Sequence, residues 1–275
     1  MKIITKILAA TLISALPFSA VMAGEALDRV MDKKLLKVAT DANWAPQSFL
    51  NDENKLDGFD VNVAQEVAKR LGVKIEFVTP AWDVITAGRW SGRWDLSIGS
   101  MTPTKERAKI LTFPAVYYYT PAAFVVHKDS SVTKVADLNG KKIGATTASV
   151  FERYLQKDLK IDAEGVPPFE FQITTDTIKS YESSNVVLDD LRLGNGSRLD
   201  AALTSVPTIQ AAIKNNYPLK QLGEPVFFEP LALAIDKGDQ EFNDKLAGII
   251  ANMKSDGTLT ELSKKWYGYD YTSTK

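Results

Sequence analysis

The stretch Gly99-Ser100-Met101-Thr102-Pro103-Thr104-Lys105-Glu106-Arg107 decides how this chain is organised. It follows the run DLSI at 95–98, which is typical of a buried strand, and it leads into a predicted helix. Pro103 suits the first turn of that helix, and Thr102 or Thr104 can cap it. A strand that passes directly into a helix leaves unpaired backbone N–H groups at the sheet edge, and such groups favour an anion.

Arg107 lies one turn inside the predicted helix. Its guanidinium can donate two parallel hydrogen bonds to a carboxylate, a geometry that lysine cannot copy. The stretch therefore predicts either a carboxylate-binding site or an ordinary capped helix whose arginine is a surface charge. Residues 99–107 alone leave both interpretations open.

The first 23 residues predict a secretory signal peptide. They begin with the two cations Lys2 and Lys6, continue through the apolar run 7–16 and end in the small-residue pattern Val21-Met22-Ala23. No later run approaches the roughly 20 apolar residues that a transmembrane helix needs. We therefore expect a protein that is secreted by a cleaved signal peptide and resides in the periplasm.

The composition narrows the classes of partner and chemistry. The 275 residues include 33 basic and 34 acidic side chains, and this balance argues against nucleic acid or an anionic membrane as partner. The chain has no cysteine and one histidine, His127, so neither a disulfide framework nor a soft metal site is expected, and no cofactor is predicted. The length suggests two lobes rather than one core.

The chain alternates predicted strands and helices, the pattern of an α/β layer with a mostly parallel sheet. In its first third, strands are predicted at 35–40, 73–77 and 95–100, and helices at 60–71, where Asp60 can cap the first turn, and at 82–90. Ligands of such sheets bind beyond the carboxyl ends of the strands. The polar or aromatic residues at that edge are Asp41, Trp44, Ser100 and Thr102.

A second α/β cycle follows, and two extended runs separate it from the first. A strand at 142–145 passes through Thr146-Thr147-Ala148-Ser149 into a helix, which predicts a second set of free N–H groups. The extended runs at 122–126 and 229–235 are predicted to be two hinge crossings between lobes. The predicted boundaries are residues 24–123 and 230–275 for lobe 1, and 124–229 for lobe 2.

The chain resembles the periplasmic polar amino-acid solute-binding proteins of ABC importers, family 3. The resemblance covers nearly all of the mature chain, and it is the order and spacing of several short motifs that make it specific. These motifs stand at 40–46, 56–61 (LDGFDV), 99–107, 138–144 (LNGKKIG), 199–203 (LDAAL), 254–259 (KSDGTL) and 265–268 (KWYG). The resemblance implies a type II periplasmic binding protein, in which two α/β lobes close on a ligand.

The resemblance also implies how a ligand carboxylate is held. Arg107 and the backbone N–H of Thr102 match the positions that bind the α-carboxylate in the family. The N–H groups of Ser149 and Val150 match positions that assist from the other lobe.

Further positions match the surroundings of the rest of the ligand. Trp44 and Trp82 stand where the family places aromatic rings around the ligand side chain, although plain core packing is the alternative for each. Gly99 and Ser100 match the place where backbone carbonyl and hydroxyl groups meet the α-ammonium. Asp41 matches a position that often contacts a cationic side chain.

One departure from the family pattern concerns the ammonium group. The family usually has an aspartate where this chain has Ser205, and a hydroxyl cannot neutralise a charge in a dry cleft. Either another acid pairs with the ammonium, or the ligand has no free α-ammonium. Glu229, at the second crossing, is the candidate substitute.

The sequence thus predicts a monomeric binding protein, not an enzyme, that captures a small carboxylate-bearing solute and delivers it to an ABC permease in the inner membrane. The solute is expected to be an amino acid or a derivative. One alternative is an enzyme that resembles cyclohexadienyl dehydratase, in which Glu229 or Asp41 would be the general acid. Another is a ligand sensor that reports to a membrane receptor.

Overall fold

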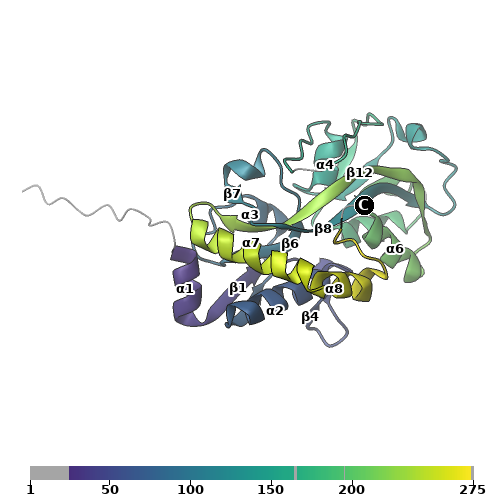
Figure 1. Ribbon diagram of the computed structural model, residues 1–275. Helices are drawn as coiled ribbons and strands as arrows, with labels where there is room; N and C mark the ends of the chain where they lie inside the picture. Colours follow the sequence, from purple (N-terminus) through teal and green to yellow (C-terminus); the bar gives the residue numbers. More distant parts are fainter. Residues whose placement is uncertain (1–24, 164–165, 195, 274–275) are drawn as a thin grey trace, which may run out of the picture.

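The computed structural model describes residues 25–163, 166–194 and 196–273, which form two lobes on one long mixed sheet (Figure 1). The predicted signal peptide, residues 1–23, lies outside the described residues. Within the described part of the chain, no helix combines the length and the apolar character needed to span a bilayer.

Two long antiparallel strands run through both lobes and join them. β8 (Val116–His127) pairs with β12 (Leu219–Asp236), and the main sheet has the order β10-β9-β11-β8-β12-β6-β1-β5. The extended runs predicted at 122–126 and 229–235 lie within these two strands, so the two crossings are confirmed. The lobe boundaries placed at 123/124 and 229/230 stay a prediction.

Lobe 1 is a parallel sheet covered by helices, as the alternating pattern predicted. β1 pairs in parallel with β5 on one side and with β6 on the other. Its elements are α1 (Glu25–Lys33), β1 (Leu35–Ala39), β2 (Asn43–Trp44), β3 (Ser48–Leu50), β4 (Leu56–Asp57), α2 (Phe59–Leu71), β5 (Lys74–Val78), α3 (Trp82–Thr86), β6 (Leu96–Met101), the 3₁₀ turn η1 (Arg107–Lys109), β7 (Leu111–Thr112), α7 (Gln240–Ser255) and α8 (Thr258–Tyr267).

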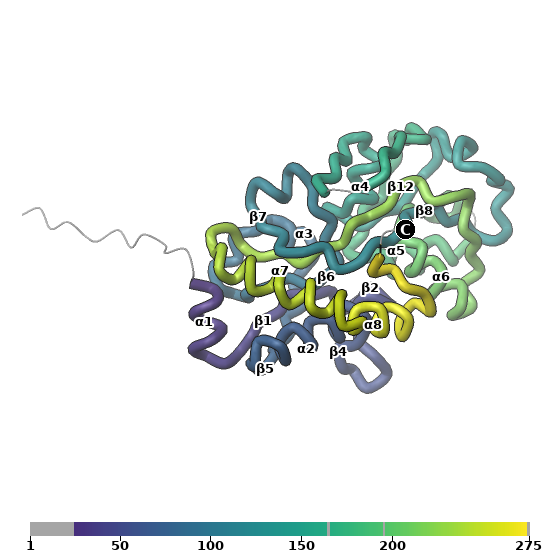
Figure 2. Tube along the Cα trace, in the orientation of Figure 1, coloured from purple at the N-terminus to yellow at the C-terminus, as the bar shows by residue number. Residues whose placement is uncertain are grey.

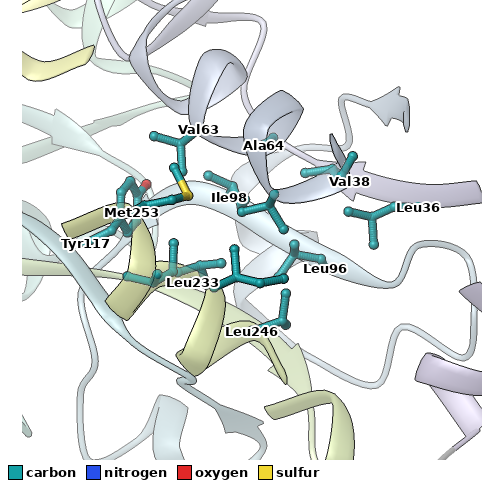
Figure 3. Packing of buried hydrophobic residues seen from close by; sticks show 14 of the residues in the cluster. Leu36, Val38, Val63, Ala64, Leu96, Ile98, Tyr117, Leu233, Leu246 and Met253 are labelled. Atoms are coloured by element: carbon teal, nitrogen blue, oxygen red, sulfur yellow. The ribbon is translucent and has the colours of Figure 1, made fainter. Parts of the chain in front are cut away.

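The core of lobe 1 joins both ends of the chain. The C-terminal helices α7 and α8, yellow in Figure 2, lie beside α1 and α2, which are purple to blue. Apolar side chains at helical spacing on α2 and α7 face the strands and are fully or almost fully buried. Figure 3 shows the cluster that they form, with Leu36, Val38, Val63, Ala64, Leu96, Ile98, Tyr117, Leu233, Leu246 and Met253.

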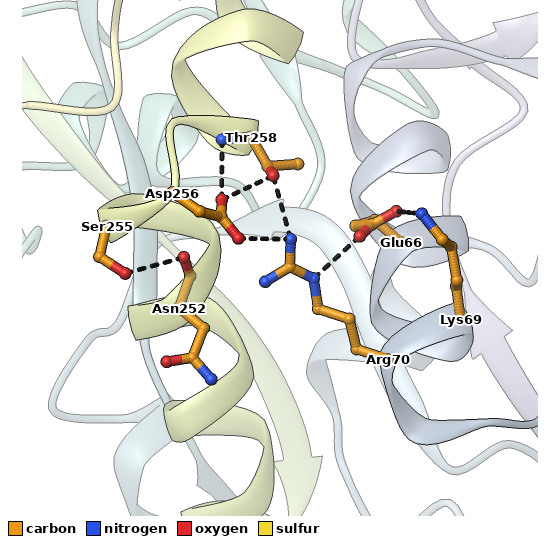
Figure 4. Close-up of polar contacts among 7 residues, drawn as sticks. All are labelled: Glu66, Lys69, Arg70, Asn252, Ser255, Asp256 and Thr258. Carbon is orange, nitrogen blue, oxygen red and sulfur yellow. Dashed lines mark hydrogen bonds and ion pairs between the residues drawn. The ribbon is translucent and has the colours of Figure 1, made fainter.

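A polar cluster around Arg70 fastens α2 to the turn between α7 and α8 (Figure 4). Nε of Arg70 donates to the carboxylate of Glu66 at 2.9 Å, and Nη2 donates to the hydroxyl of Thr258 at 3.0 Å. The same Nη2 lies 2.8 Å from Oδ2 of Asp256. These contacts hold the C-terminal helices against α2.

Two helix predictions in lobe 1 were wrong in detail. α3 ends at Thr86 instead of Trp90, because Gly88 and Arg89 have φ values of 65° and 55° and cannot continue a right-handed helix. The segment after Thr102 forms only the 3₁₀ turn η1, although the backbone N–H of Arg107 does donate to Oγ1 of Thr104 at 3.2 Å.

Asp60 does not cap α2, contrary to the prediction. Gly58 precedes the helix, and Asp60 lies within its first turn with its side chain fully buried. Its carboxylate accepts hydrogen bonds from Ser100 and Tyr117 instead of from the helix backbone. Sequence spacing alone could not show these partners, because Ser100 belongs to β6 and Tyr117 to β8, both distant from α2 in the chain.

Lobe 2 also alternates strands and helices, and it is smaller than lobe 1. β9 pairs in parallel with β10 and β11, and β11 pairs with β8 in antiparallel fashion. Its elements are the 3₁₀ turn η2 (Val135–Leu138), β9 (Ile143–Thr146), α4 (Val150–Leu155), β10 (Ile178–Tyr181), α5 (Ser184–Leu191), β11 (Ala201–Ser205) and α6 (Val206–Lys214). The sequence had not predicted β10 or α6.

Candidate ligand-binding site

A cavity lies between the lobes, next to the carboxyl ends of their strands. Residues that follow β1 and β6 come from lobe 1, residues that follow β9 come from lobe 2, and β12 contributes Glu229. This placement is the one that open α/β sheets favour for ligands. The cavity is lined by Asp41, Trp44, Trp82, Ser100, Thr102, Arg107, Thr146, Ser149, Val150, Phe151, Ser184 and Glu229.

Arg107 is buried and bridges the two lobes. Its Nη1 donates to the carbonyl oxygen of Thr102 at 2.9 Å, and its Nη2 donates to the carbonyl oxygen of Ala148, in lobe 2, at 2.8 Å. The guanidinium carbon lies 5.5 Å from the centroid of the Trp82 ring. Burial lowers the pKa of Arg107 to about 10, against the attraction of Glu229, so the group stays charged at neutral pH.

Glu229 is the buried acid of the cavity. Its carboxyl accepts hydrogen bonds from the hydroxyls of Thr102 at 3.1 Å and Thr120 at 3.5 Å. Burial raises the pKa of Glu229 to about 8, although the Thr102 hydrogen bond and the charge of Arg107 act in the opposite direction. A carboxyl with this pKa can gain or lose a proton near neutral pH.

Ser100 lines the cavity and is fixed from behind by a buried polar cluster. Its hydroxyl donates to Oδ2 of Asp60 at 2.7 Å, and its backbone N–H donates to the Tyr117 hydroxyl at 3.0 Å. The Tyr117 hydroxyl donates to Oδ1 of Asp60 at 2.7 Å, and the Tyr118 hydroxyl makes a further close contact with Ser100 Oγ. These bonds hold Ser100 at φ 52°, a conformation that non-glycine residues rarely adopt.

The buried position of Asp60 affects its protonation. Burial raises the pKa of Asp60 to about 7, while the hydrogen bonds from Ser100 and Tyr117 lower it. The carboxyl therefore titrates in the neutral range, directly behind the wall of the cavity.

Ser149 and Val150 bring the start of α4 to the cavity from lobe 2. Oγ of Ser149 accepts a hydrogen bond from the backbone N–H of Glu152 at 3.2 Å and so caps the helix. The backbone N–H of Ser149 donates to the carbonyl oxygen of Thr146 at 3.2 Å, so it is already engaged within lobe 2. Val150 is the next residue along and is the first of α4.

Asp41 and Trp82 lie on the lobe 1 side of the cavity. Oδ1 of Asp41 accepts a hydrogen bond from the backbone N–H of Asn43 at 2.7 Å, and burial raises the pKa of Asp41 against this bond. The Trp82 ring packs over Gly99, where a Cβ atom would lie 3.4 Å from Cζ3 of the indole. Gly99 therefore packs against the Trp82 ring, and it is not among the residues that line the cavity.

Ser205 also does not line the cavity. It is buried between the lobes, where its Oγ accepts a hydrogen bond from Nε2 of Gln47 at 3.2 Å. Nearby, Nε1 of Trp44 donates to Oγ1 of Thr208 at 3.0 Å, again across the lobes. A second set of contacts between lobes pairs Thr104 with Ile161 as an antiparallel bridge.

The structure therefore gathers most of the candidate residues around one cavity. The lining includes Asp41, Trp44, Trp82, Ser100, Thr102, Arg107, Ser149, Val150 and Glu229, whereas Gly99 and Ser205 lie behind it. Their contacts with a ligand stay predictions.

The sequence missed Thr146, Phe151 and Ser184 as lining residues. Thr146 ends β9, so its place at a strand end was a usable signal. Phe151 is an apolar residue in α4, and no sequence pattern pointed to it or to Ser184.

Comparison with models of known protein families identifies the family of this chain. The family model described as bacterial extracellular solute-binding proteins, family 3, matches residues 36–269, and the chain belongs to this family. The family that the sequence motifs suggested is thereby confirmed.

Individual relatives agree with this assignment. The chain is 30% identical to the L-cystine-binding protein TcyJ of Escherichia coli (strain K12) over 90% of this chain and 87% of that protein. It is 30% identical to a probable amino-acid ABC transporter-binding protein of Haemophilus influenzae over 96% of each chain. A solved ancestral arginine-binding protein bound to arginine superposes with a TM-score of 0.74 at 32% identity, covering 86% of this chain and 99% of that one.

These comparisons confirm the two-lobed α/β binding-protein fold. The relatives named above are binding proteins, and two of the names specify amino acids of different kinds. The dehydratase alternative is therefore not favoured.

Proposed function

We propose that this protein binds an α-amino acid in the cavity between its lobes and delivers it to an ABC permease. We further propose that it is a monomer, exported to the periplasm by the signal peptide at 1–23. The observation that carries the proposal is that a buried guanidinium, Arg107, and a buried carboxyl, Glu229, line the same cavity. An α-amino acid carries the two complementary charges in one small head group.

Arg107 is the proposed partner of the ligand carboxylate. Two of its N–H groups already donate to backbone carbonyl oxygens, which fix the guanidinium plane. A guanidinium has five N–H donors, so others remain to form paired hydrogen bonds with a carboxylate. The Trp82 ring and the carbonyl of Ala148 hold the group from both lobes, which ties carboxylate binding to closure.

Glu229 is the proposed partner of the ligand ammonium. A neutral Glu229 can stay buried without a ligand, because burial raises its pKa to about 8. An ammonium group beside it would favour the ionised form and complete a charge pair. Asp41 would then be left for the ligand side chain, which favours a side chain with a positive charge or with hydrogen-bond donors, between the rings of Trp44 and Trp82.

A ligand screen on protein freed of bound solute tests this proposal. The mature chain would be unfolded and refolded to remove ligand, then scanned by thermal shift against the amino acids, cystine, betaines and keto acids. A ligand at 100 times its dissociation constant adds about 2.7 kcal/mol to stability, a shift that is easy to detect. Stabilisation by amino acids, and not by keto acids or betaines, is the expected result; no response to any amino acid would contradict the proposal.

The proposal assigns no catalytic step to the cavity. Incubation of the purified protein with prephenate or arogenate should leave either compound unchanged. Formation of the dehydrated product would show an enzyme instead.

A further inference from the structure

Three side chains form a hydrogen-bonded ring between the lobes, beside the cavity, and a fourth donates a hydrogen bond to it. Trp44 and Gln47 come from lobe 1, whereas Ser205 and Thr208 come from the end of β11 and the start of α6 in lobe 2. Nε2 of Gln47 donates to Ser205 Oγ at 3.2 Å, and Thr208 Oγ1 donates to Oε1 of Gln47 at 3.4 Å. The hydroxyls of Ser205 and Thr208 lie 2.9 Å apart, and Trp44 Nε1 donates to Thr208 at 3.0 Å.

The donors and acceptors of this ring match. Because Thr208 gives its single hydroxyl proton to Gln47, the proton between the two hydroxyls belongs to Ser205. The bonds therefore run in one direction, from Gln47 to Ser205, from Ser205 to Thr208, and back to Gln47. Trp44 adds its indole N–H to the second acceptor position of Thr208.

The ring is buried and carries no charge. Gln47, Ser205 and Thr208 are at most 1% exposed, and Trp44 is 8% exposed. Separation of the lobes would break every bond that joins the two pairs. The ring therefore favours the closed arrangement through neutral hydrogen bonds, which neither a change of pH near 7 nor added salt weakens much.

We propose that Gln47, Ser205 and Thr208 are positioning residues that hold the Trp44 indole as a wall of the cavity and favour closure without any ligand charge. The inference rests on the proposed function and deepens it, because a protein that is already partly closed binds its ligand with less conformational cost. The apparent dissociation constant is inversely proportional to the fraction of protein in the binding-competent state. Ser205 thus acts on closure, at the position where the family pattern led us to expect a ligand-binding acid.

Distances between the lobes test the ring without any ligand. The chain has no cysteine, so Asp52→Cys and Lys214→Cys would provide the two label sites for pulsed electron spin resonance, one on each lobe. Thr208→Val keeps the shape of the side chain but removes the hydroxyl, and Thr208→Ser keeps the hydroxyl. Gln210→Ala, exposed on the same helix, is the matched control.

We expect the unsubstituted ligand-free protein, Thr208→Ser and Gln210→Ala to share one distance distribution with a large closed population. Thr208→Val should reduce the ratio of closed to open protein by about tenfold, the effect of losing one or two net hydrogen bonds. Gln47→Leu, which removes the amide from the other lobe, should give the same change. Identical distributions for all five proteins would overturn the proposal.

Ligand affinity separates this inference from the proposed function. With L-arginine and L-cystine as probes, Thr208→Val should raise the dissociation constant of whichever probe binds by roughly two- to fivefold, because the closed fraction falls less than the closed-to-open ratio. Thr208→Ser should leave it unchanged. If neither probe nor any other amino acid binds while the distances change as expected, the ring stands and the proposed function fails. If a probe binds the Thr208→Val and unsubstituted proteins equally and the distances agree, the ring has no role and the proposed function stands.

Discussion

The hydroxyl of Thr102 donates a hydrogen bond to Glu229 at 3.1 Å, while the carbonyl oxygen of Thr102 accepts one from Arg107 at 2.9 Å. One residue just past β6 therefore contacts both the buried acid and the buried cation of the cavity. Since both groups are removed from water, the charge of each depends on the other and on what else enters the cavity. A zwitterionic ligand satisfies both, and this relationship leads to the first two predictions.

Replacement of Arg107 by lysine should weaken ligand binding by about a hundredfold, equivalent to about 2.8 kcal/mol. An ammonium group cannot donate to two backbone carbonyls in one plane and also present paired N–H groups to a carboxylate. Isothermal titration calorimetry with the ligand found in the screen would measure the change. Arg198→Lys, whose parent side chain is 59% exposed, should bind as the unsubstituted protein does; equal binding by Arg107→Lys would rule out the carboxylate site.

Ligand affinity should rise with pH between about 6 and 8. Glu229 has a pKa of about 8 in the protein, so at lower pH an ammonium that needs the ionised carboxylate must displace a proton. The dissociation constant should fall by up to about tenfold per pH unit and level off above pH 8. Calorimetry in buffers of different ionisation enthalpy would detect the proton that is released.

Glu229→Gln should remove this pH dependence and weaken binding at pH 8 by roughly thirtyfold, because the ammonium loses its countercharge. Glu224→Gln, at an exposed position of the same strand β12, is the matched control and should leave both properties unchanged. An unaltered dissociation constant for Glu229→Gln at pH 8 would refute the ammonium pairing.

The free energy of unfolding of the ligand-free protein should fall as pH rises from about 4 to 7. Burial raises the pKa of Asp60 from 3.8 to about 7, so the folded state binds more protons than the unfolded state across this interval and is destabilised as they leave. Asp60→Asn should flatten part of the fall, by an amount on the order of a few kcal/mol. Urea titrations at pH 5 and pH 8 would measure it.

Two further results decide this prediction. Asp52→Asn, at an exposed position, should keep the pH dependence of the unsubstituted protein. A free energy of unfolding that falls equally in Asp60→Asn and in the unsubstituted protein would show that the buried carboxyl of Asp60 does not titrate in this range.

Two glycine substitutions should have opposite effects on stability. A Cβ atom at Gly144 of β9 would lie 2.7 Å from side-chain atoms of both Leu199 and Val187, so Gly144→Ala should destabilise the protein by about 1–3 kcal/mol. Gly248, in α7, has open space around it, and Gly248→Ala should stabilise by about 0.4–1 kcal/mol. Urea midpoints would show whether the signs differ, and equal signs would contradict the packing described for β9.

The fold could be predicted because its signals are local. Apolar residues at helical spacing identified α2 and α7, and runs without turn residues identified the parts of β8 and β12 that connect the lobes. Helix ends were less predictable. α3 stopped early at residues with positive φ, one of which, Arg89, carries no sign of this in its residue type.

The candidate site was predictable to the extent that it follows strand ends. Thr102 directly follows β6 and Arg107 begins the next turn, η1, so their place near the sheet edge followed from chain order. The network behind the cavity was not predictable. The sequence indicated that Asp60 caps a helix. Its hydrogen bond with Tyr117 joins residues that are 57 positions apart in the chain.

By itself, the sequence determined the α/β class, the two crossings and the edge of the sheet where polar residues gather, because hydrophobic spacing and chain order set these features. The tertiary structure alone decided that Ser205 turns toward Gln47 and not into the cavity, and that Glu229 stands near Arg107. The physical reason is that burial and hydrogen-bond partners depend on residues distant in the chain, which meet only when the two lobes are in place.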